Sequence, residues 1–254
     1  MRLLSILCLL AALGLSNPVA AQQGENSLEC QRGVLEACWL VRFGTCAHEN
    51  PRVAIPACTR RLAGPKRFFR TDGIVGGSKR VDQAQFYALR GNARFKQGNI
   101  DRALSDYNLA IKSYRNVYWV HVNRGSAYFE FGEYQAALES FDVALRLSPG
   151  NAMILNGRAR LLACSPDANV RDGARAVNDS LRAISVAERV PVIFFDTLAA
   201  AHAENGEFEL AAEIQQSAIE LLPPGDQNMI ENYRNRLALY QQGMAFRMVP
   251  APGT

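Results

Sequence analysis

The chain has 254 residues, of which 48% are hydrophobic and 20% charged, and its formal net charge is +4. This length and apolar content suffice for one elongated hydrophobic core. The net charge is too small to indicate a nucleic-acid-binding protein, and it falls by one if Arg2 is removed with the N-terminal segment.

Residues 1–21 have the pattern of a secretory signal peptide. Arg2 precedes a mainly apolar run at residues 3–15, and small residues at 19–21 precede a polar segment. The run is shorter than the roughly 20 residues that span a membrane. Cys8 lies inside it, which argues against a lipid-anchored N-terminus. We expect an exported protein, periplasmic or secreted, with no membrane span once the signal is removed.

A cysteine-rich unit, predicted to be helical, follows at residues 22–64. Cys30, Cys38, Cys46 and Cys58 lie close together in it, and in an exported chain they predict two disulfide bonds. In one unbroken helix Cys30 and Cys38 would lie about 12 Å apart along the axis, beyond the ~7 Å limit for a bridge. They can pair only if the helix breaks near Gly33, and all three pairings stay open at this point.

A basic segment, residues 65–81, is predicted to link this unit to the rest of the chain. Between Thr59 and Arg80, seven lysines and arginines face a single acidic residue, Asp72. We interpret the segment as a solvated connection. The alternative is contact with an acidic partner, an anionic lipid surface or a polyanionic wall polymer.

Two segments, residues 84–117 and 118–151, repeat the same pattern 34 residues apart. A repeat of this period predicts a stack of helix hairpins. Gly98 and Gly132 are placed to supply the positive φ of a helix C′ position. The residues in register are Arg90 and Arg124, Gly91 and Gly125, Ala93 and Ala127, Phe95 and Phe129, Gly98 and Gly132, Ala103 and Ala137, and Ala110 and Ala144.

A third copy, residues 152–190, is stretched. Ala159 and Ala176 lie 17 residues apart, where the matching residues of the second copy lie 12 apart. Residues 164–173 must therefore hold a longer loop between the two helices. Cys164, at the start of this loop, is expected to be a small apolar core residue.

The fourth copy, residues 192–225, keeps the expected spacing and closes at Pro223. Residues 227–242 are amphipathic, and we expect a capping helix that covers the apolar face of the last repeat. Residues 243–254 are expected to be a disordered tail.

This spacing resembles the tetratricopeptide repeat, whose first helix carries a large and then a small residue and whose second helix carries a small, an aromatic and a small one. In the second copy the residues in these places are His121, Gly125, Ala137, Phe141 and Ala144, and Pro149 closes the repeat. The resemblance covers residues 82–242 and implies an all-α fold, an α-solenoid of helix hairpins. The cysteine-rich helical unit precedes this solenoid, and the capping helix ends it.

The segment from Cys46 to Cys58 is similar to a leading motif of exported bacterial repeat proteins, in which a cysteine before a loop meets an Ala-Cys pair on the next helix. The resemblance implies a Cys46–Cys58 bond, with Cys30–Cys38 as the second. The competing set is Cys38–Cys58 with Cys30–Cys46. A bridge that closes so short a loop contributes about 3 kcal/mol.

No constellation of residues in the sequence indicates catalysis. His121 and His202 occupy positions where the repeat expects packing residues, His48 lies in a turn, and no Cys-x-x-Cys occurs. The carboxylates lie on amphipathic helices where solvated faces are expected. We predict a protein that is not an enzyme, with no cofactor and no metal site.

The resemblance implies a concave partner-binding surface on the first helix of each repeat. Asn92 and Asn123 are suited to bond an extended peptide backbone, and Phe95 and Phe129 to receive apolar side chains. Carried over by position, the candidate residues are Gln85, Asn92, Phe95, Lys96, Trp119, Asn123, Ser126, Phe129, Glu130, Asn156 and Arg160, with Asp196 and Glu204 from the fourth copy.

This surface predicts a non-enzymatic protein–protein interaction module, a periplasmic adaptor or scaffold that binds a peptide or protein of the cell envelope. The alternatives are an accessory or inhibitory subunit of an envelope enzyme and a purely structural, oligomerising unit. Ala88, Met153 and Gly157 stand where relatives that bind chaperone tails carry cations, which argues against a partner of that kind.

Overall fold

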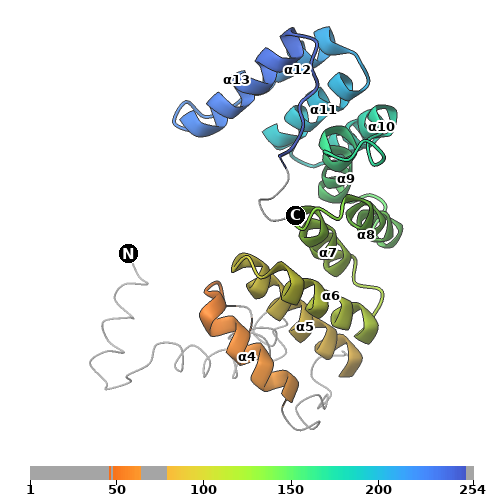
Figure 1. The fold of residues 1–254 in the computed structure, drawn as a ribbon, viewed down its shortest axis with the longest axis vertical. Coiled ribbons are helices and arrows are strands. Elements are labelled where there is room, and N and C mark those ends of the chain that lie inside the picture. Colours follow the sequence, from red (N-terminus) through yellow and green to blue (C-terminus); the bar gives the residue numbers. More distant parts are fainter. Residues whose placement is uncertain (1–45, 47, 64–78, 250–254) are drawn as a thin grey trace, which may run out of the picture. The chain divides into compact units, whose positions relative to one another are not determined.

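The computed structural model describes residue 46 and residues 48–63 and 79–249, and every regular element among them is a helix (Figure 1). The predicted signal peptide, Cys30, Cys38 and most of the predicted linker lie outside the described residues. The chain divides into two compact units, residues 1–115, called unit 1, and residues 116–254, called unit 2.

The described part of unit 1 consists of α4 (Pro51–Ala63), α5 (Lys79–Lys96) and α6 (Ile100–Ser113). The α5–α6 pair forms a hairpin, and α4 packs against α5. The hairpin turns at Gly98, whose φ of 74° is the left-handed conformation predicted for it. Helix α5 begins at Lys79, within the last residues of the predicted linker.

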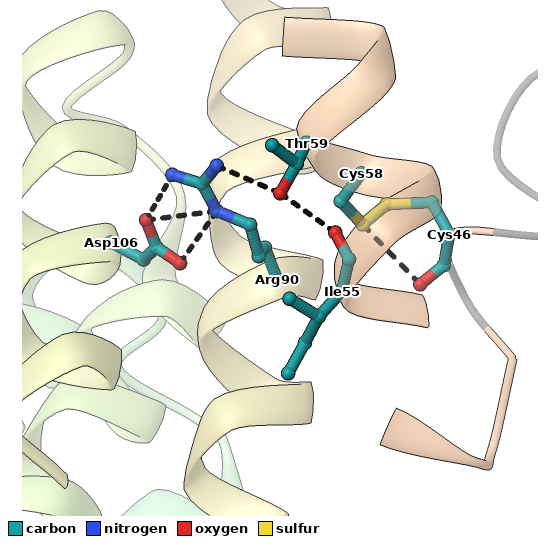
Figure 2. Close-up of a disulfide and its surroundings, with 6 residues drawn as sticks. All are labelled: Cys46, Ile55, Cys58, Thr59, Arg90 and Asp106. Atoms are coloured by element: carbon teal, nitrogen blue, oxygen red, sulfur yellow. Dashed lines mark hydrogen bonds and ion pairs between the residues drawn. A yellow bond between two sulfur atoms is a disulfide. The ribbon is translucent and has the colours of Figure 1, made fainter. Parts of the chain in front are cut away.

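A disulfide bond joins Cys46 to Cys58, with the two Cα atoms 4.9 Å apart (Figure 2). This is the pairing that the resemblance implies. Phe86 of α5 is buried against both cysteines, and Leu62 and Leu89 pack around them. The bond therefore lies in the apolar contact between α4 and α5.

An ion-pair cluster joins the helices of unit 1 (Figure 2). The carboxylate of Asp106, fully buried on α6, accepts from Nε of Arg90 at 2.9 Å, from its Nη2 at 2.7 Å and from Nη1 of Arg94 at 2.9 Å. Nη1 of Arg90 also donates to the hydroxyl of Thr59 on α4, at 3.3 Å. Arg90 thus connects all three helices.

Unit 2 consists of three successive hairpins and a last helix. The hairpins are α7 (Tyr118–Glu130) with α8 (Tyr134–Leu147), α9 (Ala152–Cys164) with α10 (Gly173–Val186), and α11 (Val192–Glu204) with α12 (Phe208–Glu220), and α13 (Gln227–Gln241) packs against α12. The α7–α8 turn lies at Gly132, whose φ of 84° also agrees with its prediction. Helix α9 contacts α8, α10 and α11.

The longer loop that the sequence predicts connects α9 to α10. Its backbone N–H of Asp172 donates to the carbonyl of Leu162 at 3.0 Å. Nη1 of Arg171 donates to the carbonyls of Ser165 and Pro166 at 2.9 and 3.2 Å. These bonds satisfy backbone groups of the loop that would otherwise need water as a hydrogen-bond partner, and they hold the loop against the end of α9.

Alanines form the closest contacts between the helices of unit 2. They leave room for larger neighbours such as Ile154, Leu161 and Phe194, which are also buried. At the end of the unit, Ile230 and Tyr233 of α13 are buried against α12, as expected of a capping helix. The fully buried alanines are Ala127, Ala137, Ala144, Ala159, Ala163, Ala176, Ala183, Ala199, Ala201, Ala211 and Ala218.

The segment after α13 is ordered where the structure describes it, so the prediction of a disordered tail is wrong for residues 243–249. The chain turns at Gly243 and then runs without regular structure alongside α11 towards α9 (Figure 1). Met248 is buried in the main hydrophobic cluster of the unit, and Phe246 packs against the same cluster. Burial of these two apolar side chains outweighs the entropy of a free end.

Candidate functional site

A cavity of about 180 Å³ lies among α7, α8, α9 and the C-terminal segment. Four of its lining residues, Ser126, Phe129, Glu130 and Arg160, are ones that the sequence analysis named. The first three lie on α7 and the fourth on α9, both first helices of their repeats. The other residues that line it are Phe141, Gly157, Leu161 and Met248.

A second cavity, of about 270 Å³, adjoins the first. The two share Phe129, Glu130, Arg160 and Met248 as lining residues. The remaining lining residues of the second cavity are Tyr134, Phe246 and Val249. We call the two cavities and their lining residues the inner site.

The inner site is lined by apolar and polar groups together, with aromatic and aliphatic side chains beside one acid and one base. Phe129 packs edge-on against Tyr134, with ring centroids 5.5 Å apart. Burial, with help from Glu130, raises the pKa of Tyr134, so its phenol is neutral at pH 7. Glu130 and Arg160 are exposed at the rim. Such a site suits an apolar side chain flanked by polar backbone.

The C-terminal segment has three polar anchors beside the inner site. The amide N–H of Met248 donates to the carbonyl of Cys164 at 2.9 Å. The guanidinium of Arg247 lies 2.5 Å from the Glu204 carboxylate, and its Nη1 donates to the carbonyl of Ala163 at 3.4 Å. The guanidinium of Arg236 lies over the Phe246 ring, 4.4 Å from its centroid.

These residues of the C-terminal segment escaped the sequence analysis. It treated everything after the capping helix as a tail, although Phe246 and Met248 alternate with other residues at the spacing of two that an extended segment uses to bury one face. That alternation was the available signal. It is weak because it covers only two positions.

Two residues carried over to the concave surface are buried instead. Asn156 is 5% exposed and Asp196 is 4% exposed, so neither offers appreciable surface to a partner. Asp196 accepts from Gln215 Nε2 at 3.0 Å and pairs with Arg236. Helix α9 is contacted by three other helices, which leaves less of its circumference for solvent than the repeat pattern implies.

The other candidate residues do not line the inner site. Trp119 and Asn123 lie on α7, half-buried. The Oδ1 of Asn92 accepts a hydrogen bond of 2.9 Å from the hydroxyl of Tyr107, so this asparagine also serves the packing of α5 on α6. In unit 1 lie Gln85, Asn92, Phe95 and Lys96.

Cys164 is a buried free thiol, as expected of a small core residue. Burial above all, and then the charge of Asp196, raises the pKa of this thiol to about 12. A thiol with that pKa is not a nucleophile at neutral pH. In the described ranges no group of three histidine, cysteine or acidic side chains could hold a metal ion.

Residues 88–152 match the sequence model of a family described as "Tetratricopeptide repeat". The match spans parts of both units, from α5 to the start of α9, and the helix hairpins, turn glycines and buried alanines lie where that repeat requires them. Residues 88–152 therefore belong to the tetratricopeptide repeat family. Proteins of this family bind protein or peptide partners and are generally non-enzymatic scaffolds.

Solved structures share the fold of this chain. A tetratricopeptide repeat protein from Parabacteroides merdae ATCC 43184 has a TM-score of 0.58 and 17% identity over 88% of this chain and 75% of that chain. BtubC (BKLC) from P. vanneervenii has a TM-score of 0.57 and 14% identity, over 87% and 93%. MamA has a TM-score of 0.53 and 16% identity, over 67% and 87%. A comparison with curated proteins found no match.

These similarities establish an all-α solenoid of helix hairpins, and the family match over residues 88–152 indicates an interaction module. At such identities the solved structures indicate the fold and not a shared partner. None of the helices that the structure describes is long and apolar enough to span a bilayer.

Proposed function

We propose that this tetratricopeptide repeat protein is a non-enzymatic adaptor of the cell envelope that binds a protein or peptide partner at the inner site of unit 2. The observation that carries the proposal is the pair of adjoining cavities on the first helices α7 and α9, whose lining includes the apolar side chains of Phe129 and Met248. Concave sites of this kind, with a few polar groups at the rim, are where proteins receive ligands.

The chemistry of the inner site favours a peptide over a reactive small molecule. Phe129 and Met248 supply apolar walls, and Glu130 and Arg160 supply one charge of each sign at the rim. These groups can hold side chains and pair with backbone, but they include no nucleophile beside a base.

Location in the envelope is supported by two independent features of the chain. Residues 1–21 have the signal-peptide pattern, and the disulfide between Cys46 and Cys58 is a bond that persists in oxidising compartments. Mass spectrometry of the mature protein tests this part of the proposal. A chain that begins after residue 21 is expected, and a mature chain that retains Met1 contradicts export.

Site-specific photo-crosslinking tests the binding site. A photoreactive phenylalanine analogue replaces Ser126, which lines the first cavity, and the protein is irradiated in intact cells. The matched control places the same analogue at Gln135, an exposed residue of α8 that lines neither cavity. We expect a discrete adduct from position 126 and none from position 135.

Two outcomes of this experiment contradict the proposal. If position 126 yields no adduct while the protein is folded and exported, the inner site does not bind a partner. If positions 126 and 135 yield the same adducts with equal efficiency, contact with the partner does not depend on the inner site.

A further inference from the structure

The segment Phe246-Arg247-Met248 lies against unit 2 in the way that an extended peptide ligand would. The segment has no regular structure of its own, and its side chains and backbone contact the ends of α9 and α11 and the side of α13. Two of its side chains, Phe246 and Met248, also form walls of the inner site. The site that we propose for a partner is therefore partly occupied by the chain itself.

Met248 supplies a backbone anchor and an apolar one. Its amide N–H bonds to the carbonyl of Cys164, the last residue of α9, at a helix end where carbonyls lack intrahelical donors. Its side chain is 8% exposed and joins the main hydrophobic cluster. Backbone pairing combined with a buried side chain is how extended peptides are usually recognised.

Arg247 supplies the charged anchor. Its guanidinium meets Glu204, whose other carboxylate oxygen accepts from Nε of Arg171 at 3.0 Å. Arg171 is in turn held by loop carbonyls, so the acceptor is positioned before Arg247 arrives. The carbonyls at the end of α9 add the negative end of the helix dipole, which favours a cation here.

Phe246 supplies the aromatic anchor. The guanidinium of Arg236 lies over its ring, and that guanidinium is held by the buried carboxylate of Asp196. A cation fixed over a ring face selects an aromatic side chain over an aliphatic one of similar size. Three successive residues thus each meet a group suited to their own chemistry.

We propose that the inner site recognises an extended peptide with an aromatic residue, an arginine and a methionine-like apolar residue in succession, and that Phe246-Arg247-Met248 is a displaceable internal ligand of that site. This inference rests on the proposed function and adds to it the chemistry of the partner. A partner that presents the same three side chains binds by replacing the chain's own segment.

The fit of the internal segment leaves room for a stronger ligand. Cavities of about 180 and 270 Å³ remain next to Met248, so a longer apolar side chain or a longer peptide gains contacts that methionine does not make. Val249 is 89% exposed, and the segment follows the last helix. Its release therefore exposes a short stretch of chain and unfolds no helix.

A peptide-binding measurement tests the inference. The probe is a fluorescein-labelled peptide with the sequence of residues 243–250, Gly-Met-Ala-Phe-Arg-Met-Val-Pro. The protein is the full mature chain, either unchanged or with Phe246→Ala, Arg247→Ala and Met248→Ala together. We expect the triple variant to bind the peptide at least roughly tenfold more tightly, because a tethered competitor has a high effective concentration.

Controls separate recognition from a general apolar surface. Met244→Ala, at an exposed position of the same segment that lines neither cavity, should bind the peptide as weakly as the unchanged chain. A peptide with glutamate in place of arginine should bind the triple variant at least roughly tenfold more weakly, because it meets Glu204. Equal binding of the two peptides, or equal binding by the triple variant and the unchanged chain, overturns the inference.

Hydrogen exchange in the unchanged chain keeps the test valid if the triple variant fails to fold. Excess peptide should speed exchange of the Met248 amide, which the bond to Cys164 protects in the free protein. If saturating peptide leaves this exchange rate unaltered, the segment is a fixed part of the structure and the proposal that it is displaced is overturned.

The failure of this inference is distinguishable from failure of the proposed function. If position 126 yields adducts but the peptide does not bind specifically, the adaptor proposal is retained and the predicted chemistry of the partner is rejected. If the peptide binds specifically but position 126 yields no adduct in cells, the internal ligand is retained and the proposal of an external partner is rejected.

Discussion

Arg247 and Glu204 form an ion pair with 2.5 Å between guanidinium nitrogen and carboxylate oxygen, and this pair joins the C-terminal segment to the end of α11. The arginine side chain is 37% exposed and the glutamate 15% exposed. The pair is therefore partly screened by water, and its contribution is about 1 kcal/mol. That is a suitable strength for a contact that holds a segment in place and still allows its release.

Arg247→Glu should loosen the segment. Two carboxylates would then face each other, and we expect the Met248 amide to exchange roughly tenfold faster, with little change in helix content. Exchange measured by mass spectrometry on peptides that cover residue 248 checks this. Arg247→Lys, which keeps a positive charge opposite Glu204, should retain slow exchange. An Arg247→Glu variant that exchanges at the unchanged rate contradicts the anchoring role of the pair.

Gly91→Ala should destabilise the α5–α6 hairpin. A Cβ atom at this position would lie 2.7 Å from Cε1 of Tyr107, a buried ring that is held by its hydroxyl bond to Asn92. Because the ring cannot move aside freely, we expect a loss of about 1–3 kcal/mol in the free energy of unfolding. Denaturant titration measures this loss.

Gly150→Ala is the matched control for this substitution. A Cβ at Gly150 has no neighbour within 4 Å. It should leave the free energy of unfolding unchanged or raise it by a few tenths of a kcal/mol, because alanine lowers the conformational entropy of the unfolded chain. Tolerated glycine replacements typically stabilise by about 0.4–1 kcal/mol. Equal effects of the two substitutions would show that the contact with Tyr107 is not what excludes a side chain at Gly91.

Asp106→Asn should cost about 3 kcal/mol, because it leaves Arg90 and Arg94 without the buried carboxylate that neutralises them. Asp142→Asn is the control, since Asp142 also receives two arginines but is 29% exposed, and Arg158 keeps its second partner Asp179. The control should lose about 1 kcal/mol or less. The unfolding midpoints of the two variants in urea are compared with that of the unchanged chain. A larger decrease for Asp106→Asn than for Asp142→Asn is expected of a buried cluster.

Alkaline pH should destabilise unit 2 through Cys164. The pKa of this thiol rises from its ordinary 9.0 to about 12, chiefly through burial. Above pH 9 the unfolded chain loses the thiol proton while the folded chain keeps it, so the free energy of unfolding falls as the pH rises towards 12. One such group contributes at most about 1.4 kcal/mol per pH unit.

The control for this pH dependence is Cys164→Ala. Burial also raises the pKa of Tyr233 to about 12, so some alkaline sensitivity should persist in the variant. We expect the slope between pH 9 and 10.5 to become shallower. If the slope is the same with and without the thiol, Cys164 is not the group that titrates.

The repeat architecture could be predicted because it depends on local backbone and size. Gly98 and Gly132 have the positive φ expected at the ends of their helices, and alanines such as Ala137 and Ala144 are fully buried at helix crossings. Few residue types satisfy either requirement. Their recurrence every 34 residues therefore predicts the fold. The Cys46–Cys58 pairing likewise followed from a short motif.

The candidate surface was only partly predictable because it depends on which neighbours cover each helix. Ser126, Phe129, Glu130 and Arg160 meet at one cavity as their positions imply. Asn156 lies on the same helix as Arg160 but is buried, and this helix packs against α8, α10 and α11. The residue pattern within a single repeat does not predict which of its residues the neighbouring repeats will cover.

The C-terminal segment shows the same limit more clearly. Its helix propensity is broken after Gln241, and its apolar alternation is too short to specify a partner surface. Met248 is buried only because the ends of α7 and α9 present a hollow of matching size. That hollow exists only after the hairpins have stacked.

The most direct test of this account is the yield of photo-crosslinked adduct from position 126 in cells, compared between the unchanged chain and the Arg247→Glu variant. If the inner site binds an envelope partner in competition with the C-terminal segment, the variant should yield more of the same adduct, by roughly tenfold where the partner does not saturate the site. An adduct yield that is equal in the two chains, or lower in the variant, would contradict the account.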